Sequence, residues 1–237
     1  MRLHLVNDLP LFGIIDDRPS GERLVHEEVR RLCSLIPASV TYLSFDDVER
    51  LWANSVPAAC DVLVLVGTRP PRLCARRSSI RNRFSLVVAA TLRTLNSQGH
   101  TESVLVTFDT PLDQLGEAEE LYVIDDVAMS GITLQAVLTA LSQHRSWGSM
   151  SVRVLVATVR SLEQVRASFP TVNTRAEMVL DFEPIDHGTV IFLWDLLYGT
   201  LRGQPFLTQT ELLLPFFGRD LSVLYRLRHA IADGGTK

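Results

Sequence analysis

The sequence contains almost no lysine. Of its 23 basic residues only Lys237 is a lysine, and the other 22 are arginines. A chain without an internal lysine has no side chain to form a Schiff base, which excludes pyridoxal-phosphate chemistry and class I aldolase chemistry. The Gly-Lys-Ser/Thr sequence of a Walker A loop is also absent. Any phosphate that the protein binds must therefore be held by arginine, by backbone N–H groups or by hydroxyls.

Cysteines and long apolar runs are scarce as well. The three cysteines, Cys33, Cys60 and Cys74, are widely spaced and form no CxxC pair, so neither a disulfide framework nor a zinc knuckle is expected. A reducing, cytoplasmic setting fits this pattern best. No apolar run approaches the ~20 residues of a membrane span, and polar residues interrupt the first eight positions too early for a secretory signal. The net charge of −4 gives no overall electrostatic support for binding nucleic acid.

Apolar patterning predicts strands that alternate with helices. Runs and alternation of apolar residues predict strands near residues 40–45, 61–66, 103–108, 121–124, 152–158, 178–182 and 189–193. Apolar residues at helical spacing predict helices near residues 24–32, 84–95, 134–141 and 165–169. This alternation predicts an α/β fold, with a mainly parallel sheet and helices on both of its faces.

The composition changes from about residue 178, where aromatic and apolar residues crowd together before a last predicted helix near 219–232. We therefore predict a core over residues 1–177, which includes the N-terminal segment. Residues 178–237 are predicted to form a subdomain that serves as a hood over the site or as an interface with a second copy. A homodimer is expected.

One short segment carries a phosphate-binding pattern. After the strand predicted at 121–124 and two carboxylates, a short loop with Ser130 and Gly131 leads into a helix near Thr133. Gly131 lets the backbone approach a ligand without a Cβ in the way. The N–H groups of the loop and of the first helical turn, together with the helix dipole, form an anion site that suits a phosphate monoester. The hydroxyls of Ser130 and Thr133 can add donors.

The two carboxylates, Asp125 and Asp126, stand just before this loop. Ionised carboxylates only accept hydrogen bonds, so the partner that suits them is a vicinal diol or a metal ion. A diol clamp beside a phosphate cradle predicts a site for ribose 5-phosphate. The alternative interpretation is that the acidic pair is a turn signal and that Ser130 is an ordinary helix cap.

The segment Val123–Thr133 resembles the motif of the type I phosphoribosyltransferases that binds phosphoribosyl pyrophosphate (PRPP). In that motif apolar residues precede an acidic pair, three variable positions and Ser/Thr-Gly-x-Thr. The resemblance implies a type I phosphoribosyltransferase-like fold with a hood. It also implies transfer of ribose 5-phosphate from PRPP to a nitrogenous base, or to a similar small acceptor, with release of pyrophosphate.

The resemblance also implies roles for individual residues. Asp125 and Asp126 would bind the ribose 2′- and 3′-hydroxyls, and the residues from Ala128 to Thr133 would wrap the 5′-phosphate. Mg²⁺ would be held mainly through PRPP, with Asp125 or Asp126 as its protein ligand. The predicted PRPP-binding residues of this segment are Asp125, Asp126, Val127, Ala128, Met129, Ser130, Gly131, Ile132 and Thr133.

A second element follows the strand predicted at 61–66, where Thr68 and Arg69 occupy the place of the family's pyrophosphate-binding loop. We predict that both bind pyrophosphate and that Arg69 acts with Asp125 and Asp126 in catalysis. Five further arginines follow before residue 84, a density that can neutralise a diphosphate. A solvated basic surface or a nucleic-acid patch is the alternative. The five are Arg72, Arg76, Arg77, Arg81 and Arg83.

The sequence departs from the family at Met129, where members that act on 6-oxopurines carry an aspartate. Methionine cannot act as an acid or base, so that purine chemistry is absent at this position. Two other acidic pairs, Asp16-Asp17 and Asp46-Asp47, have no phosphate loop after them and are interpreted as turn or helix-start signals. The residues that contact the acceptor stay open; candidates are Phe182, Glu183, Asp186, His187, Phe192, Trp194 and Asp195.

Two other functions remain as alternatives. The first is a regulator that binds PRPP or a nucleotide without catalysis and controls a partner. The second is an enzyme that acts on phosphoribosyl compounds with water or with an unusual acceptor.

Overall fold

A computed structural model describes residues 2–6, 39–66, 84–95, 101–128, 130–180 and 188–192. The chain divides into two compact units. One comprises Arg50–Glu183, and the other comprises Met1–Glu49 together with Pro184–Lys237. The predicted domains, residues 1–177 and 178–237, divide the chain differently. No helix within the described ranges is long and apolar enough to cross a membrane.

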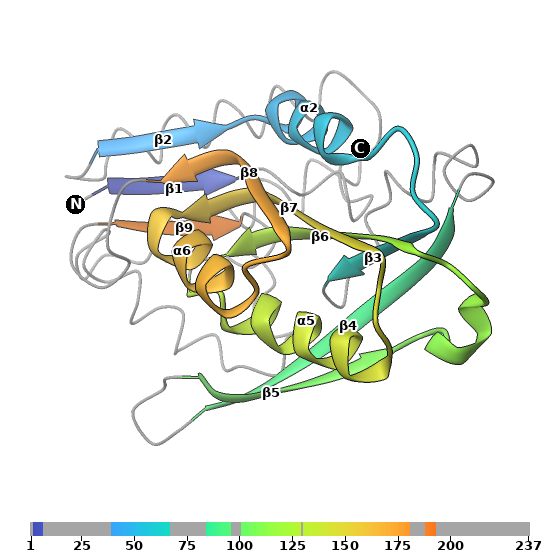
Figure 1. Cartoon of the computed structure of the whole chain (residues 1–237). Helices are drawn as coiled ribbons and strands as arrows, with labels where there is room; N and C mark the ends of the chain where they lie inside the picture. Colours follow the sequence, from blue (N-terminus) through green and yellow to red (C-terminus); the bar gives the residue numbers. More distant parts are fainter. Residues whose placement is uncertain are drawn as a thin grey trace, which may run out of the picture. The chain divides into compact units, whose positions relative to one another are not determined.

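The unit that joins the two ends of the chain contains a three-stranded parallel sheet (Figure 1). Strand β1 (Arg2–Val6) lies at its centre, between β2 (Ser39–Leu43) and β9 (Gly188–Phe192). Strands β2 and β9 were predicted, whereas β1 was not. Because β1 pairs directly with β9, the N-terminal residues group with the C-terminal ones, although the sequence analysis assigned them to the core. A hood or interface role for residues 178–237 stays a prediction.

Helix α2 (Phe45–Ser55) follows β2, and a reciprocal side-chain cap fixes its start. The Ser44 hydroxyl and backbone N–H both donate to Asp47 Oδ2, at 2.7 and 3.0 Å. In return the Asp47 N–H donates to Ser44 Oγ at 3.3 Å. Reciprocal bonds of this capping-box type satisfy amides that the helix itself leaves without partners. The Asp46-Asp47 pair is therefore a helix-start signal, as predicted.

The second unit contains a six-stranded sheet in the order β5-β4-β3-β6-β7-β8. All neighbouring strands are parallel except β4 and β5. Helices α5 and α6 lie side by side on one face of this sheet (Figure 1). The predicted α/β fold, with a mainly parallel sheet flanked by helices, is thus confirmed, whereas helices on the second face of the sheet stay a prediction. The elements are β3 (Val62–Val66), β4 (Ser85–Leu95), β5 (Thr101–Phe108), a 3-10 turn η2 (Leu112–Leu115), β6 (Glu120–Ala128), α5 (Ile132–His144), β7 (Ser149–Thr158), α6 (Val159–Ser168) and β8 (Asn173–Leu180).

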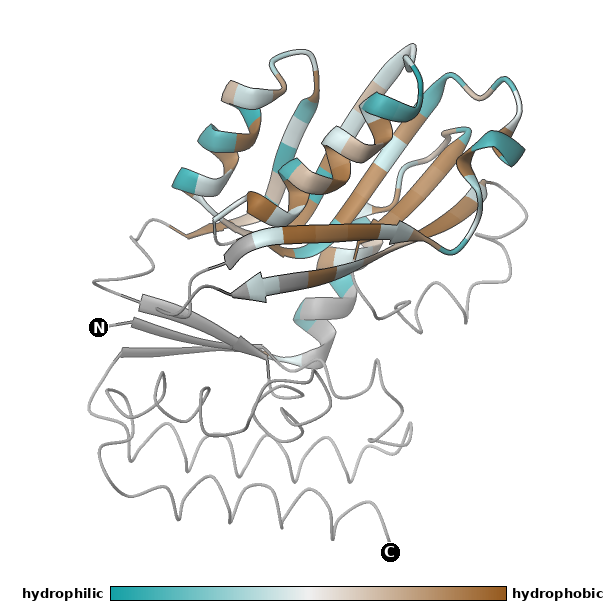
Figure 2. Cartoon of the chain, turned by 90° about the horizontal axis from the view of Figure 1, so that it is seen from below, coloured by the Kyte–Doolittle hydropathy of each residue, from teal (hydrophilic) through white to brown (hydrophobic). Residues whose placement is uncertain are grey.

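The core of this unit lies between the sheet and the helices α5 and α6 that cover it (Figure 2). Helix α5 buries its predicted apolar stripe, Leu134, Val137, Leu138 and Leu141, against strand residues such as Val123. All five residues of β3 are buried, including Leu63 and Leu65 on its other face. Burial of both faces explains why the central strands are continuous apolar runs rather than alternating ones.

Residues 84–95 were predicted to form a helix, and this prediction was wrong. They form β4, which pairs with β3 on one side and with β5 on the other. The apolar stripe fits helical spacing, but Val87, Val88 and Thr91 are β-branched and favour a pleated strand. Pairing with two neighbouring strands outweighs the helical periodicity. The helices predicted near residues 24–32 and 219–232 lie outside the described residues.

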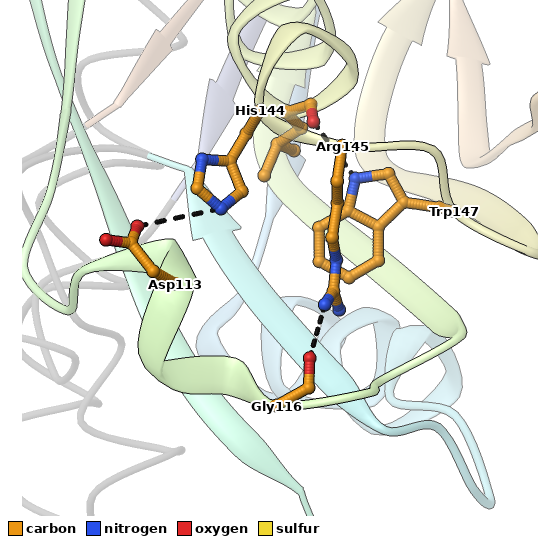
Figure 3. A network of polar contacts seen from close by, with 6 residues as sticks. Asp113, Gly116, His144, Arg145 and Trp147 are labelled. Carbon is orange, nitrogen blue, oxygen red and sulfur yellow. Dashed lines mark hydrogen bonds and ion pairs between the residues drawn. The ribbon is translucent and has the colours of Figure 1, made fainter.

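Side chains fix the loop before β6 at the amino edge of the sheet. Asp61 Oδ2 accepts the backbone N–H groups of Glu119 and Glu120, each at 2.8 Å. The Arg145 guanidinium, just beyond α5, donates to the carbonyl of Gly116 (Figure 3) and also to that of Ala118. Its charge also lies 4.0 Å from the centre of the Trp147 ring, a distance typical of a cation–π contact. These contacts hold the end of the sheet that lies opposite the candidate site.

Acid is expected to destabilise the fold partly through Asp61. The backbone hydrogen bonds from Glu120 and Glu119 lower the pKa of Asp61 in the folded protein. Ionised Asp61 therefore stabilises the fold above the ordinary aspartate pKa of about 4, and this contribution is lost as the pH falls through the lowered value. Urea unfolding at neutral and acidic pH measures it. Asp61→Asn is expected to show a smaller loss of stability in acid than the wild type, and an equal loss in both would contradict the prediction.

Candidate functional site

The order of the six strands places the candidate site at the carboxyl ends of β3 and β6. From β3 the chain continues to β4 on one side, whereas from β6 it continues through α5 to β7 on the other side. In open α/β sheets ligands bind at such a reversal, just outside the carboxyl ends of the strands. Asp125 and Asp126 belong to β6 at this point of the sheet.

Both carboxylates lie within β6 and not just after it. The strand was predicted to end at Ile124, which pairs with Leu65 of β3, but pairing with β7 extends β6 to Ala128. Successive strand residues point to opposite faces. Asp125 therefore shares the α5 face with Val123, and Asp126 lies on the other face. The two aspartates consequently differ in accessibility, because Asp125 is only 4% exposed and Asp126 is half-buried.

Asp125 also bonds to its own neighbour. Its Oδ1 accepts the backbone N–H of Asp126 at 2.9 Å. This bond fixes the backbone from which the Asp126 carboxylate projects. The buried aspartate thus organises the end of the strand, and the half-buried one is better placed to meet a ligand.

The start of α5 provides the predicted anion-binding groups, in a segment, Ser130–Thr133, that we call the anion segment. Gly131 is the N-cap, with φ +74°, in the left-handed region that favours glycine. It has no side chain with which to cap the helix, and the amides of the first turn have no carbonyl partner within the helix. Ser130 is exposed and Thr133 is half-buried. Such a helix start favours a bound anion.

Three of the predicted site residues cannot be placed. Met129, Thr68 and Arg69 lie outside the described residues, as does the rest of the arginine-rich segment 67–83. Their roles stay predictions. The structure does show that β3, the strand that leads into that segment, is the direct neighbour of β6.

The sequence analysis missed one residue at the site, Ser161 in the first turn of α6. Its side chain is fully buried, and its hydroxyl donates to the Ala128 carbonyl at 2.7 Å. The sequence signal was the pair Thr158 and Ser161, in which the Thr158 hydroxyl accepts the Ser161 N–H at 3.1 Å and caps the helix. Such a pair marks a helix start, but it gives no sign that the serine contacts another loop.

The described residues contain no group of three or more histidine, cysteine or acidic side chains that could hold a metal ion. Mg²⁺ does not require such a group, because it commonly binds one or two carboxylates together with the phosphates of a substrate. The half-buried Asp126 carboxylate, beside the buried Asp125, fits this mode of binding. The site thus combines oxygen acceptors on β6 with amide donors on α5.

Comparison with known proteins identifies no family for the chain. No family model matches it, and no curated protein matches it. Solved structures with a similar arrangement include a hypothetical protein from Neisseria gonorrhoeae with bound ppGpp (16% identity, 70% of this chain and 95% of that one, TM-score 0.42). A second is a purine phosphoribosyltransferase from Pyrococcus horikoshii Ot3 (15% identity, 65% of this chain and 92% of that one, TM-score 0.46). A third is an APRTase from Giardia lamblia in complex with 9-deazaadenine (15% identity, 67% of this chain and 98% of that one, TM-score 0.41).

Proposed function

We propose that the protein is a phosphoribosyltransferase, which binds PRPP at the carboxyl end of β6 and transfers its ribose 5-phosphate to a nitrogenous base or similar acceptor. One observation carries the proposal. Two adjacent carboxylates lie near the carboxyl end of β6, and four residues after Asp126 the anion segment begins at Ser130, followed by the glycine N-cap of α5. A ligand that carries a vicinal diol and a phosphate close together, as PRPP does, would satisfy both parts.

Each part of the site suits one part of this ligand. The Asp126 carboxylate accepts hydrogen bonds from the ribose hydroxyls more strongly than a neutral side chain would, and the buried Asp125 holds the backbone of Asp126 in place. The amides of the anion segment and the Ser130 hydroxyl donate to the 5′-phosphate. Together they hold the ribose at two points, which fixes the orientation of C1 toward an acceptor.

The reaction needs no covalent enzyme intermediate. The bond between C1 and the pyrophosphate oxygen breaks with its electron pair remaining on pyrophosphate, and a lone pair of the acceptor nitrogen forms the new bond to C1. Thr68 and Arg69 would stabilise the charge that develops on pyrophosphate. Mg²⁺ bound by PRPP and Asp126 would supply further positive charge there. Met129 has no group that exchanges a proton, so any proton lost by the acceptor leaves by another route.

Calorimetric titration with PRPP, with and without Mg²⁺, tests the binding step. We expect one Mg²⁺-dependent site per chain with a Kd on the order of micromolar. Ribose 5-phosphate and pyrophosphate, titrated separately, are expected to bind more weakly, because each engages only part of the site. An absence of PRPP binding would contradict the proposal.

A panel of purine, pyrimidine and pyridine bases tests the chemical step. Pyrophosphate release that requires one of these bases, with formation of the matching ribonucleotide, would support the transferase. Pyrophosphate release without any acceptor would indicate hydrolysis. PRPP binding without turnover would favour the regulator.

A further inference from the structure

We infer that Ser161 is a positioning residue that holds the anion segment in its binding conformation from the side of α6. The inference rests on the proposed function in so far as it names the ligand as a phosphate ester. Ser161 is fully buried and lies 33 residues from its hydrogen-bond partner Ala128. Ala128 is the last residue of β6, directly ahead of the residues that bind the phosphate.

The hydroxyl of Ser161 anchors the end of β6. Its Oγ lies 2.7 Å from the Ala128 carbonyl oxygen and 2.9 Å from the Thr158 carbonyl oxygen. A hydroxyl has a single proton, so it donates fully to one carbonyl at a time. The bond to Ala128 is the shorter of the two, and it joins the strand that carries both carboxylates to the first turn of α6.

The backbone of Ser161 meets the anion segment itself. A Cβ at Gly131 would lie 3.0 Å from the Ser161 carbonyl oxygen and 3.3 Å from Val165 Cγ2. Gly131 therefore lies directly against the first turns of α6. Ser161 thus bonds to the residue before position 129 through its hydroxyl and lies beside the glycine that follows that position.

The helix does not require this hydroxyl for its own cap. The N–H of Ser161 already donates to the Thr158 hydroxyl at 3.1 Å, and Thr158 serves as the N-cap of α6. Removing the Ser161 hydroxyl leaves that bond in place and removes the link to Ala128. The expected consequence is a looser anion segment on an intact helix.

Ser161→Ala tests the inference, with Thr174→Val as the matched control. Thr174 is also buried, and its hydroxyl donates to the Val172 carbonyl at 3.4 Å, on the edge strand β8, which β7 separates from β6. The first measurement is hydrogen exchange, without ligand, of the Gln135 amide, whose bond to the Gly131 carbonyl at 2.9 Å joins the anion segment to α5. We expect roughly tenfold faster exchange in Ser161→Ala, the effect of one lost hydrogen bond of ordinary strength, and no change in Thr174→Val.

The second measurement is the Kd for PRPP with Mg²⁺. We expect it to rise about tenfold in Ser161→Ala and to change less than about twofold in Thr174→Val. Wild-type exchange rates and affinity in a folded Ser161→Ala would overturn the inference, as would an equal loss of affinity in both variants. If Ser161→Ala does not fold, Ser161→Cys, which keeps a weak donor of similar size, is expected to show the same changes to a smaller extent.

The two proposals fail in different ways. If the wild type does not bind PRPP, the proposed function is wrong, but the exchange measurement still decides the role of Ser161 because it needs no ligand. If the wild type binds PRPP and the exchange rates of the two variants are equal, the proposed function stands and the positioning role is wrong.

Discussion

Replacing Asp126 with asparagine is expected to weaken PRPP binding by about 10- to 100-fold, the effect of losing one charge-assisted hydrogen bond. Stability should change little, because the residue is half-buried and its backbone, not its carboxylate, makes the bond to Asp125. Calorimetry with PRPP and urea unfolding measure the two quantities on the same variant. If Asp126→Asn binds PRPP with the wild-type Kd, the Asp126 carboxylate does not bind the ribose hydroxyls.

The neighbouring variant, Asp125→Asn, is the control for this prediction, since it makes the same chemical change one residue away. Asp125 is 4% exposed and accepts the Asp126 N–H through Oδ1. Asparagine can still accept that bond but introduces buried N–H donors, and an unsatisfied buried donor costs about 1–3 kcal/mol. We therefore expect Asp125→Asn to lower the free energy of unfolding as well as the affinity. Equal effects of the two variants on stability would contradict the assignment of one aspartate to the strand and the other to the ligand.

Replacing Gly131 with alanine is expected to cost about 2–5 kcal/mol of stability and most of the affinity for PRPP. A left-handed conformation costs an alanine about 1–2 kcal/mol. The new Cβ would also lie 3.0 Å from the Ser161 carbonyl oxygen, which belongs to a helix and cannot move alone. Overpacking of this kind adds about 1–3 kcal/mol. The displaced amides of the anion segment would no longer converge on a phosphate.

Gly116→Ala is a control for backbone strain without a neighbouring contact. Gly116 has φ +63° and ψ −145°, whereas Gly131 has φ +74° and ψ −7°, and nothing lies within 4 Å of the missing Cβ of Gly116. Gly116→Ala is therefore expected to cost only backbone strain, about 1–3 kcal/mol in a region almost confined to glycine, and to leave PRPP binding unchanged. Calorimetry with PRPP on both variants separates the effect of backbone strain from that of the contact with α6. If Gly131→Ala weakens PRPP binding no more than Gly116→Ala does, the packing of Gly131 on α6 does not shape the anion segment.

Local signals were sufficient for much of this fold. Continuous apolar runs identified β3 and β7 because both faces of these strands are buried, and the stripe from Leu134 to Leu141 identified α5 because one face of that helix is buried. The acidic pair and Gly131 were predicted at the site because two carboxylates after a strand, followed by a loop with a hydroxyl and a glycine and then a helix, are typical of a phosphate-binding site. Their joint role with PRPP stays a prediction.

The remaining features depend on contacts between distant residues. Residues 84–95 have an apolar stripe that suits a helix, and only pairing with β3 and β5 makes them a strand. The extension of β6 through Asp125 and Asp126 follows from its register with β7, which placed the carboxylates on opposite faces rather than in a loop. Ser161 was missed for the same reason, since its partner Ala128 is 33 residues away.

The pairing of β3 with β6 also bears on how the protein folds. The hydrogen bonds between Asp61 and Glu120 join residues that are 59 positions apart in the sequence. The bond from Ser161 of α6 to Ala128 joins residues that are 33 positions apart. Closing such long loops loses chain entropy before the contacts stabilise the chain, so these pairings form slowly. Binding competence therefore arises only at the end of folding, when the strands, α5 and α6 have all assembled. A ligand that recognises the finished site alone would pull the folding equilibrium toward the native state in proportion to its concentration.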